Sequence, residues 1–132
     1  MDGLRIVRRV HDEIVAHALR VAPVECCGLV EIEAGTVVAA RAVDNVAASP
    51  HRFEFGSQDV LEIPRIEERG RTPGIYHSHT LSAPEPSATD LQFGALWPGV
   101  PWLIVGTSAA APVVRCFQFD RGVAVERPLE HC

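Results

Sequence analysis

Apolar residues recur at helical spacing near the start of the chain and at strand spacing through most of the rest. Residues 4–6 suit a short strand, and the pattern that follows has its apolar positions on one side of a helix. These positions are Val7, Val10, Ile14 and Ala18. Because proline cannot continue a helix, we expect this helix to end before Pro23.

Short apolar runs bounded by turn residues indicate several strands. CCGLVEIE (26–33) and TVVAARAVD (36–44), separated by Ala34-Gly35, predict a β-hairpin. The other runs that we predict as strands are HRFEF (51–55), TPGIYHSH (72–79), PWLIVGT (101–107), PVVRCFQFD (112–120) and VAVERP (123–128).

Two further helices lie between these runs. Ser57 is a suitable N-cap for a helix running toward Arg69, but Pro64 predicts a kink or a later start. Ser87 begins another helix, which Pro98-Gly99 ends. Helices and strands alternate early and a run of strands follows, so we expect an α+β (α/β layered) fold, a mixed β-sheet flanked by helices. With no repeat, low-complexity tract or linker, we expect one domain over residues 1–132.

Length and composition are those of a globular chain. The 132 residues are 47% hydrophobic, enough to bury a core. No apolar run approaches the roughly 18 residues of a membrane span, and MDGLRIVRRVHDE at the N-terminus does not resemble a signal peptide. We therefore expect a soluble, cytoplasmic protein without a membrane partner. The net charge is −5 with both signs interspersed, which predicts no nucleic-acid partner because such partners need a basic face.

Four cysteines occur without a C-x-x-C pair, which disfavours a cysteine-based zinc site or a redox motif. Adjacent Cys26 and Cys27 would point to opposite faces of a strand, so a bridge between them is not expected. We expect Cys26, Cys27, Cys116 and Cys132 to be ordinary reduced thiols. A cysteine–histidine protease based on Cys26 or Cys27 remains an alternative.

The segment GIYHSHTLSAPEPSATD (74–90) carries the strongest chemical signal. Alternate residues of a strand share a face, so His77 and His79 would direct both imidazoles toward one point. Zinc takes histidine nitrogens at about 2.0–2.1 Å and prefers four tetrahedral ligands. Two imidazoles and one carboxylate from the next element would supply three ligands, leaving the fourth position for water, as in a catalytic site.

Each half of this pattern also has an ordinary structural explanation. An isolated H-x-H pair often binds no metal. Ser87 followed three residues later by Asp90, ahead of an apolar helix, is typical of an N-terminal cap whose carboxylate the helix dipole favours. Both roles are compatible if Ser87 caps the helix while Asp90 faces the histidines. The combined arrangement is far more specific than either part.

HSHT-x6-SATD resembles the signature of the JAMM (MPN+) zinc metalloproteases, which is H-[ST]-H, seven residues, then S-x-x-D. The interval TLSAPEP has the required length. PVECCGLV (23–30) is similar to the family's P-x-E-x-C-G-L-[LV] segment, with Glu25 at the matching place. Looser similarity extends to RFEF, to GIYHSH and to Trp97 followed by PWLIV, so it covers most of the chain. The chain departs from the pattern at Cys27, which follows Cys26, and at Pro64.

The resemblance implies an MPN fold, similar in architecture to the cytidine deaminases, whose H-x-E and P-C-x-x-C motifs this chain lacks. It implies a zinc ion held by His77, His79 and Asp90, with water as the fourth ligand. Glu25 would be the general base for that water and then the proton donor to the leaving amine, and Ser87 would help to stabilise the oxyanion. The residues alone do not single out Glu25 from the other acidic side chains.

The same resemblance implies a substrate class. The chain looks like the short bacterial members that act on β-grasp sulfur-carrier or ubiquitin-like proteins ending in Gly-Gly. We therefore expect hydrolysis of the amide after the diglycine, which removes a C-terminal extension or releases cysteine from a carrier conjugate. The alternatives are a broader isopeptidase that removes ubiquitin-like modifiers from lysine and a non-catalytic MPN scaffold, although scaffold members lack the metal ligands.

Overall fold

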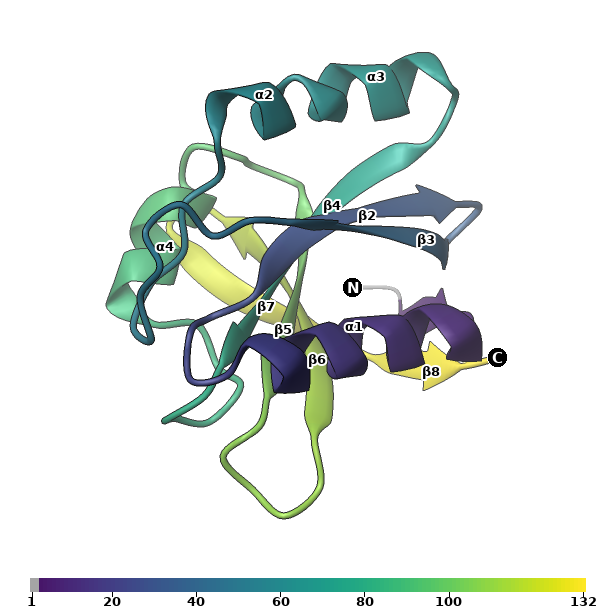
Figure 1. Ribbon diagram of the computed structural model, residues 1–132. Coiled ribbons are helices and arrows are strands. Elements are labelled where there is room, and N and C mark those ends of the chain that lie inside the picture. The colour runs from purple at the N-terminus through teal and green to yellow at the C-terminus, as the bar shows by residue number, and fades with distance from the viewer. Residues whose placement is uncertain (1–2) are drawn as a thin grey trace.

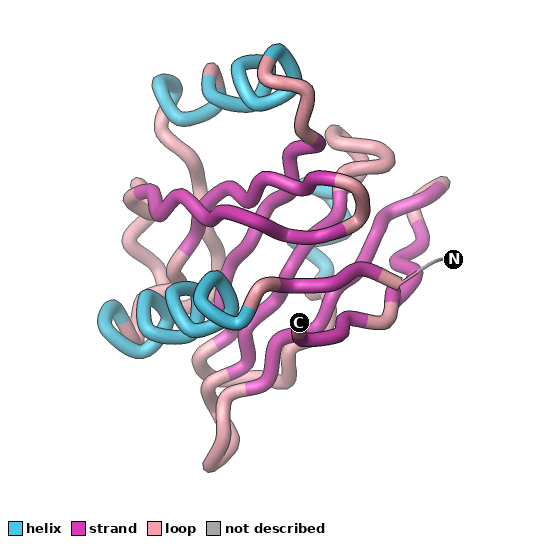
Figure 2. Tube along the Cα trace, turned by 90° about the vertical axis from the view of Figure 1, so that its right-hand side faces the viewer, coloured by secondary structure: helices cyan, strands magenta, loops and turns pink. Residues whose placement is uncertain are grey.

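The computed structural model describes residues 3–132 and contains an eight-stranded sheet with the order β7-β6-β5-β4-β2-β3-β1-β8 (Figures 1 and 2). The strands are β1 (Leu4–Ile6), β2 (Cys27–Glu33), β3 (Thr36–Val43), β4 (Thr72–His79), β5 (Pro101–Gly106), β6 (Val113–Asp120), β7 (Val123–Arg127) and β8 (Leu129–His131). β4 is parallel to β5, and β1 is parallel to β3 and β8, whereas the other neighbours are antiparallel. The mixed sheet expected from the sequence is confirmed.

The helices cover both faces of this sheet. They are α1 (Arg8–Val21), α2 (Ser57–Val60), α3 (Glu62–Glu68) and α4 (Ala88–Gly94). Figure 2 shows α1 and the α2–α3 pair on opposite sides of the β2–β3 hairpin. Apolar residues of α1 share a core with Val30 and Leu103, and residues of α3 and α4 share another with Ile75 and Trp102. No helix in the described part of the chain is long and apolar enough to cross a bilayer.

Alternation along β4 places the histidines on one face. Tyr76 belongs to the core beneath α1, whereas Ile75 belongs to the core beneath α3 and α4. His77 shares the face of Ile75, and its ring packs against Trp102 with centroids 5.5 Å apart. Ser78 turns the other way, where its Oγ accepts the Cys26 N–H at 2.8 Å. The strand therefore separates the two histidines from the serine between them, as its period of two predicts.

The strand predicted at 51–55 is wrong. This segment is neither helix nor strand, although Phe53 is buried and Phe55 is half-buried, so the side-chain alternation that prompted the prediction is real. Its backbone finds local partners instead of a neighbouring strand. The Glu54 carbonyl accepts the Val46 N–H at 3.0 Å, and the side chain of Asn45 bonds to Arg52 and Glu54. Local side-chain bonds of this kind compete with a sheet ladder.

The helical boundaries also differ in part from the expectation. The helix expected from Ser57 is divided at Leu61, and Pro64 lies in the first turn of α3, where a missing N–H leaves no helical bond unmade. The helix is thus interrupted rather than started later, since α2 begins at Ser57. The predicted N-cap is wrong, because the N-cap is Gly56 and not Ser57. The helix after Ser87 ends at Gly94 rather than at Pro98. β8 was not predicted, because three residues show no periodicity and their pairing with β1 is made across the whole chain.

A glycine in β2 lets a buried polar pair form beneath α1. His17 of α1 is buried, and its Nδ1 lies 2.7 Å from the Tyr76 hydroxyl. The Tyr76 ring crosses Gly28, where an added Cβ would lie 2.1 Å from the ring and 2.5 Å from the Arg41 carbonyl. Only a residue without a side chain fits between them.

Replacing Gly28 by alanine is therefore expected to destabilise the fold by about 1–3 kcal/mol, the range for overpacked cores. The added methyl group meets one backbone atom and one ring with no free space, so both β3 and Tyr76 must move. Urea denaturation of Gly28→Ala and the wild type measures the difference. An unchanged denaturation midpoint would contradict this account of the Tyr76–His17 packing.

Candidate metal centre

Three potential metal ligands converge where the end of β4 meets the start of α4. His77 and His79 occupy alternate positions of β4, and Asp90 lies in the first turn of α4. The Nε2 atoms of the two histidines are 3.1 Å apart. Asp90 Oδ1 lies 3.1 Å from His77 Nε2, and Asp90 Oδ2 lies 3.0 Å from His79 Nε2. All three side chains are buried, and their arrangement is one that could hold a metal ion.

The donor set and its dimensions fit zinc. Zinc binds imidazole nitrogen and carboxylate oxygen at about 2.0–2.2 Å, so the ligands of a tetrahedral site lie roughly 3.3–3.5 Å from one another. The separations here are 3.1, 3.1 and 3.0 Å, close to those of such a site. The two Nε2 atoms also face one another, an arrangement in which a shared cation satisfies both lone pairs.

Burial and mutual contact prepare these donors for a cation. Burial lowers the pKa of His77, which favours the neutral imidazole that binds a metal. Burial alone would raise the pKa of Asp90, but hydrogen bonds with His77 and His79 outweigh it and keep that pKa below its ordinary range. Burial alone would also lower the pKa of His79, but Asp90 and the Ala83 carbonyl outweigh it and raise that pKa. The cluster therefore presents an ionised carboxylate between two imidazoles.

Asp90 combines the two roles considered for it. Ser87 is the N-cap of α4, its Oγ accepts the Asp90 N–H at 3.1 Å, and Asp90 Oδ2 accepts the Ser87 N–H at 2.9 Å. This reciprocal capping box fixes the carboxylate while its oxygens face the histidines. Ser87 Oγ accepts one bond through its lone pair, so its own hydrogen stays available for another acceptor.

The second imidazole is oriented by the loop that follows β4. His79 Nδ1 lies 2.9 Å from the Ala83 carbonyl, which leaves Nε2 to face the other donors. The loop is packed down by Pro84, which lies so close to Gly106 that a Cβ there would come within 2.7 Å of it. The Thr80 hydroxyl donates to the Pro23 carbonyl at 3.0 Å and so joins this loop to the segment that leads into β2.

Glu25 lies near His79 and Asp90, two residues before β2 begins at Cys27. Its N–H donates to the Ser49 carbonyl at 2.9 Å, and its carbonyl accepts from Asn45 Nδ2 at 3.0 Å. The residue is 4% exposed, and its Oε1 has no hydrogen-bond partner in the part of the chain that the structure describes. Burial raises the pKa of Glu25 to about 8, His79 opposes this and Asp90 adds to it. A buried carboxyl group with one oxygen unengaged can exchange a proton with a molecule that enters the site.

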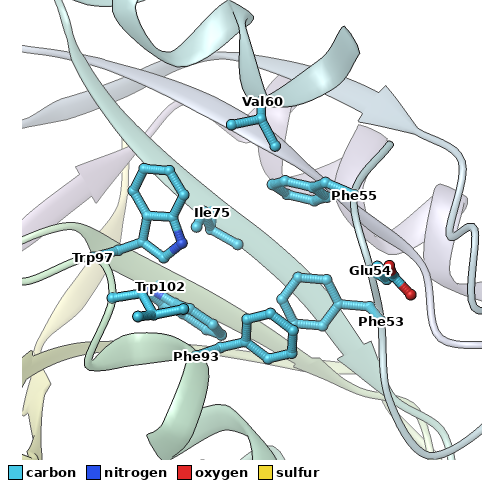
Figure 3. A pocket seen from close by; sticks show the side chains of 9 residues that line it. Phe53, Glu54, Phe55, Val60, Ile75, Phe93, Trp97 and Trp102 are labelled. Carbon is cyan, nitrogen blue, oxygen red and sulfur yellow. The ribbon is translucent and has the colours of Figure 1, made fainter. Parts of the chain in front are cut away.

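Aromatic side chains separate the histidines from an apolar pocket, and the sequence reasoning missed their part in the site. The Phe53 ring stacks on His77 with centroids 4.5 Å apart and also packs against Phe93 and Trp102. Figure 3 shows Phe53, Phe93 and Trp102 together on one side of a cavity of about 190 Å³, with Phe55 and Val60 across from them. One ring therefore belongs both to this pocket and to the surroundings of His77.

The cysteines do not support a thiol nucleophile. Cys26 and Cys27 are buried in the cores on opposite faces of the sheet, as expected for neighbours at the start of a strand. Burial raises the pKa of the Cys26 thiol to about 11 and that of the Cys27 thiol to about 12. A reactive cysteine needs a lowered pKa. All four cysteines are free, and Cys132 is exposed.

Comparison with known families agrees with this geometry. The family model for prokaryotic homologues of the JAB domain matches residues 7–120, a range that includes Glu25, both β4 histidines, Ser87 and Asp90. The chain belongs to this JAB family. Its buried His-His-Asp group and its metallopeptidase relatives make it a JAMM-type metallopeptidase.

The relatives of this JAB chain include peptidases from archaea and bacteria. It is 40% identical over 110 residues to a desampylase of Haloferax volcanii, which covers 76% of this chain and 78% of the relative. It is 31% identical over 121 residues to the CysO-cysteine peptidase of Mycobacterium tuberculosis, covering 88% of this chain and 82% of that one. The fold is that of the JAB1/MPN domain protein AF2198 from Archaeoglobus fulgidus, with a TM-score of 0.60, 17% identity and coverage of 98% and 99%.

Proposed function

We propose that this protein is a zinc-dependent peptidase that hydrolyses the amide bond after the C-terminal Gly-Gly of a ubiquitin-like or sulfur-carrier protein. The observation that carries the proposal is the buried carboxyl group of Glu25, which interacts electrostatically with His79 and Asp90 and whose Oε1 has no hydrogen-bond partner among residues 3–132. A metal site and a proton-transferring group side by side are what amide hydrolysis requires.

In this proposal His77, His79 and Asp90 hold the zinc. Zinc bound there would polarise the scissile carbonyl and make an attacking water more acidic. Glu25 takes a proton from the water as the water oxygen bonds to the carbonyl carbon of the last glycine. Glu25 then delivers a proton to the amide nitrogen as the C–N bond breaks. Ser87 has a hydroxyl hydrogen to donate to the developing oxyanion. The products are a carrier ending in a free diglycine carboxylate and an amine.

The narrowness of the site supports glycine at the cleaved position. His77, His79, Asp90 and Glu25 are between 0% and 4% exposed, so a backbone carbonyl reaches them only by a close approach. Glycine permits such an approach because it has no side chain to clash. The relatives' names support the same class, since one is a CysO-cysteine peptidase and the other a desampylase. Release of cysteine from a carrier conjugate, and trimming of an extension beyond Gly-Gly, are the two reactions that we favour.

Zinc-loaded enzyme is expected to cleave a β-grasp carrier extended by cysteine, or by a few residues, directly after Gly-Gly. Intact-mass measurement of the carrier before and after incubation reports the cut. Replacing the last glycine of the carrier by valine should reduce the rate by roughly 10²-fold, because a misplaced carbonyl costs about that much. Changes in the released group should have a smaller effect.

A parallel substrate decides between this proposal and its alternatives. A carrier joined to a lysine side chain tests the broader isopeptidase. If this substrate is cut while both extended carriers stay intact, the proposed cleavage after Gly-Gly of a sulfur carrier is wrong and the broader isopeptidase activity is favoured. If zinc-loaded protein cuts none of the three, the non-catalytic scaffold is favoured.

A further inference from the structure

Asn45 uses the whole hydrogen-bonding capacity of its side chain at the end of β3. It is the sole asparagine in the sequence. Its Nδ2 donates to the carbonyls of Glu25 and Arg52, both at 3.0 Å. Its Oδ1 accepts the Ala47 N–H at 3.0 Å and the Glu54 N–H at 3.1 Å. A primary amide has two hydrogens to donate and two lone pairs to accept with, and here all four are engaged.

These bonds reach two residues whose side chains interact with the metal ligands. One ends on Glu25, whose carboxyl group interacts with His79 and Asp90. Two others end on the residues before and after Phe53, whose ring stacks on His77 with an interplanar angle of 27°. A single side chain therefore connects the proton-transferring carboxylate to the ring that packs against a metal ligand.

Regular secondary structure does not fix either group. Phe53 lies in the segment between β3 and α2, which is neither helix nor strand, and Glu25 lies two residues before β2 begins. The backbone of Glu25 meets this segment at Ser49, and Glu54 meets Val46. Because these partners lie in the same connection as Asn45, the amide is the central link that holds the connection in one shape.

We propose that Asn45 is a positioning residue that sets Glu25 and Phe53 relative to the metal ligands. The inference rests on the proposed role of Glu25 as the base, which it deepens. Its physical basis is the steep dependence of catalysis on geometry, in which a shift of 1 Å in a reacting group can lower the rate by about 10²-fold. All four bonds of the Asn45 amide go to backbone groups, so it would act through Glu25 and Phe53.

Replacing Asn45 by aspartate tests the hydrogen-bond donors of the side chain while keeping its shape. Asn45→Asp keeps the size and the acceptor for the Ala47 and Glu54 N–H groups, but it loses both donors and places a carboxylate against the carbonyls of Glu25 and Arg52. Gln118→Glu is a matched control. Its amide also donates to a carbonyl, that of Gly99, at 2.9 Å, and it belongs to β6, outside the connection that holds Phe53.

Zinc content, steady-state kinetics on an extended carrier and the indole N–H signal of Trp102 are measured on both variants. The Trp102 ring lies 5.7 Å from the Phe53 centroid, so its signal reports any movement of that ring without activity being needed. Asn45→Asp is expected to retain about one zinc per chain, to lower kcat by roughly 10–100-fold with KM changed less than about threefold, and to shift the Trp102 signal. Gln118→Glu should match the wild type. Should Asn45→Asp not fold, Asn45→Ala removes the same donors without adding charge.

Two results would overturn the proposal. One is a wild-type kcat with an unshifted Trp102 signal. The other is a fall in zinc content that matches the fall in kcat, because it would make Asn45 a purely structural residue. Should the wild type cut no carrier, or should Glu25→Gln retain full activity, the proposed function fails. The Trp102 signal of Asn45→Asp then tests separately whether Asn45 positions Phe53. A shifted signal supports this role, and an unshifted signal contradicts it.

Discussion

Replacing Asp90 by asparagine is expected to reduce bound zinc from about one ion per chain to a small fraction and to remove peptidase activity. Asparagine keeps the shape of the cap on α4 but lacks the negative charge that lies 3.1 Å from His77 Nε2 and 3.0 Å from His79 Nε2. Without that charge only the two imidazoles and a weakly binding amide oxygen remain to hold the dication. Bound zinc supplies several kcal/mol of transition-state stabilisation, so the rate should fall on the order of 10³-fold or more. His77→Ala should behave in the same way.

Elemental analysis of the purified proteins measures the loss, and circular dichroism checks that the fold is retained. His51→Ala is the matched control, because His51 is exposed and lies outside the cluster. It should bind as much zinc as the wild type. Full zinc occupancy in both Asp90→Asn and His77→Ala would show that the metal lies elsewhere and that the assignment of the three ligands is wrong.

The convergence of His77, His79 and Asp90 could be predicted because each part of it follows from local rules. His77 and His79 share a face through the two-residue period of a strand, and Ser87 caps the helix that carries Asp90 through a motif four residues long. Glu25 is different. Nothing local distinguishes it from the other acidic residues, and its place beside the donors depends on the pairing of β2 with β4. The resemblance to the family identified it, and periodicity did not.

The roles of Asn45 and Phe53 could not be predicted, for the reason that made the 51–55 strand wrong. An alternating pattern shows which side chains are buried, and Phe53 is buried as it suggests. It does not show which partners the backbone takes. Two of those partners come from one amide side chain, that of Asn45 after β3, which hydrogen-bonds to the backbone of residues 52 and 54. β8 was missed because its partner, β1, lies at the opposite end of the chain.

Replacing Glu25 by glutamine is expected to leave zinc bound and to lower turnover by roughly 10²–10⁴-fold, the loss typical of removing a general base. Glutamine keeps the size of the side chain but cannot accept a proton. Its amide has the size of the carboxyl group that it replaces, whose Oε1 has no hydrogen-bond partner among the described residues. Zinc content together with single-turnover kinetics on an extended carrier separates loss of the base from loss of the metal. Glu85→Gln makes the same chemical change on an exposed carboxylate that pairs with Arg115 at 3.3 Å, and it should stay close to wild-type activity.

The stability of the metal-free proteins gives a second, independent test of Glu25. Its pKa in the folded protein is raised from 4.5 to about 8, first by burial, so the fold favours the protonated carboxyl group. The stabilisation from that proton is fully present below about pH 4.5 and is lost as the pH rises through 8. Glutamine is neutral at every pH, so its contribution to the stability of the fold does not fall as the pH rises. Metal-free Glu25→Gln should therefore unfold at a higher urea concentration than metal-free wild type at pH 8, and the gap should narrow toward pH 4.5. Wild-type turnover in Glu25→Gln would mean that another group moves the proton. A urea midpoint at pH 8 below that of the wild type would mean that Glu25 is not the buried acid described here.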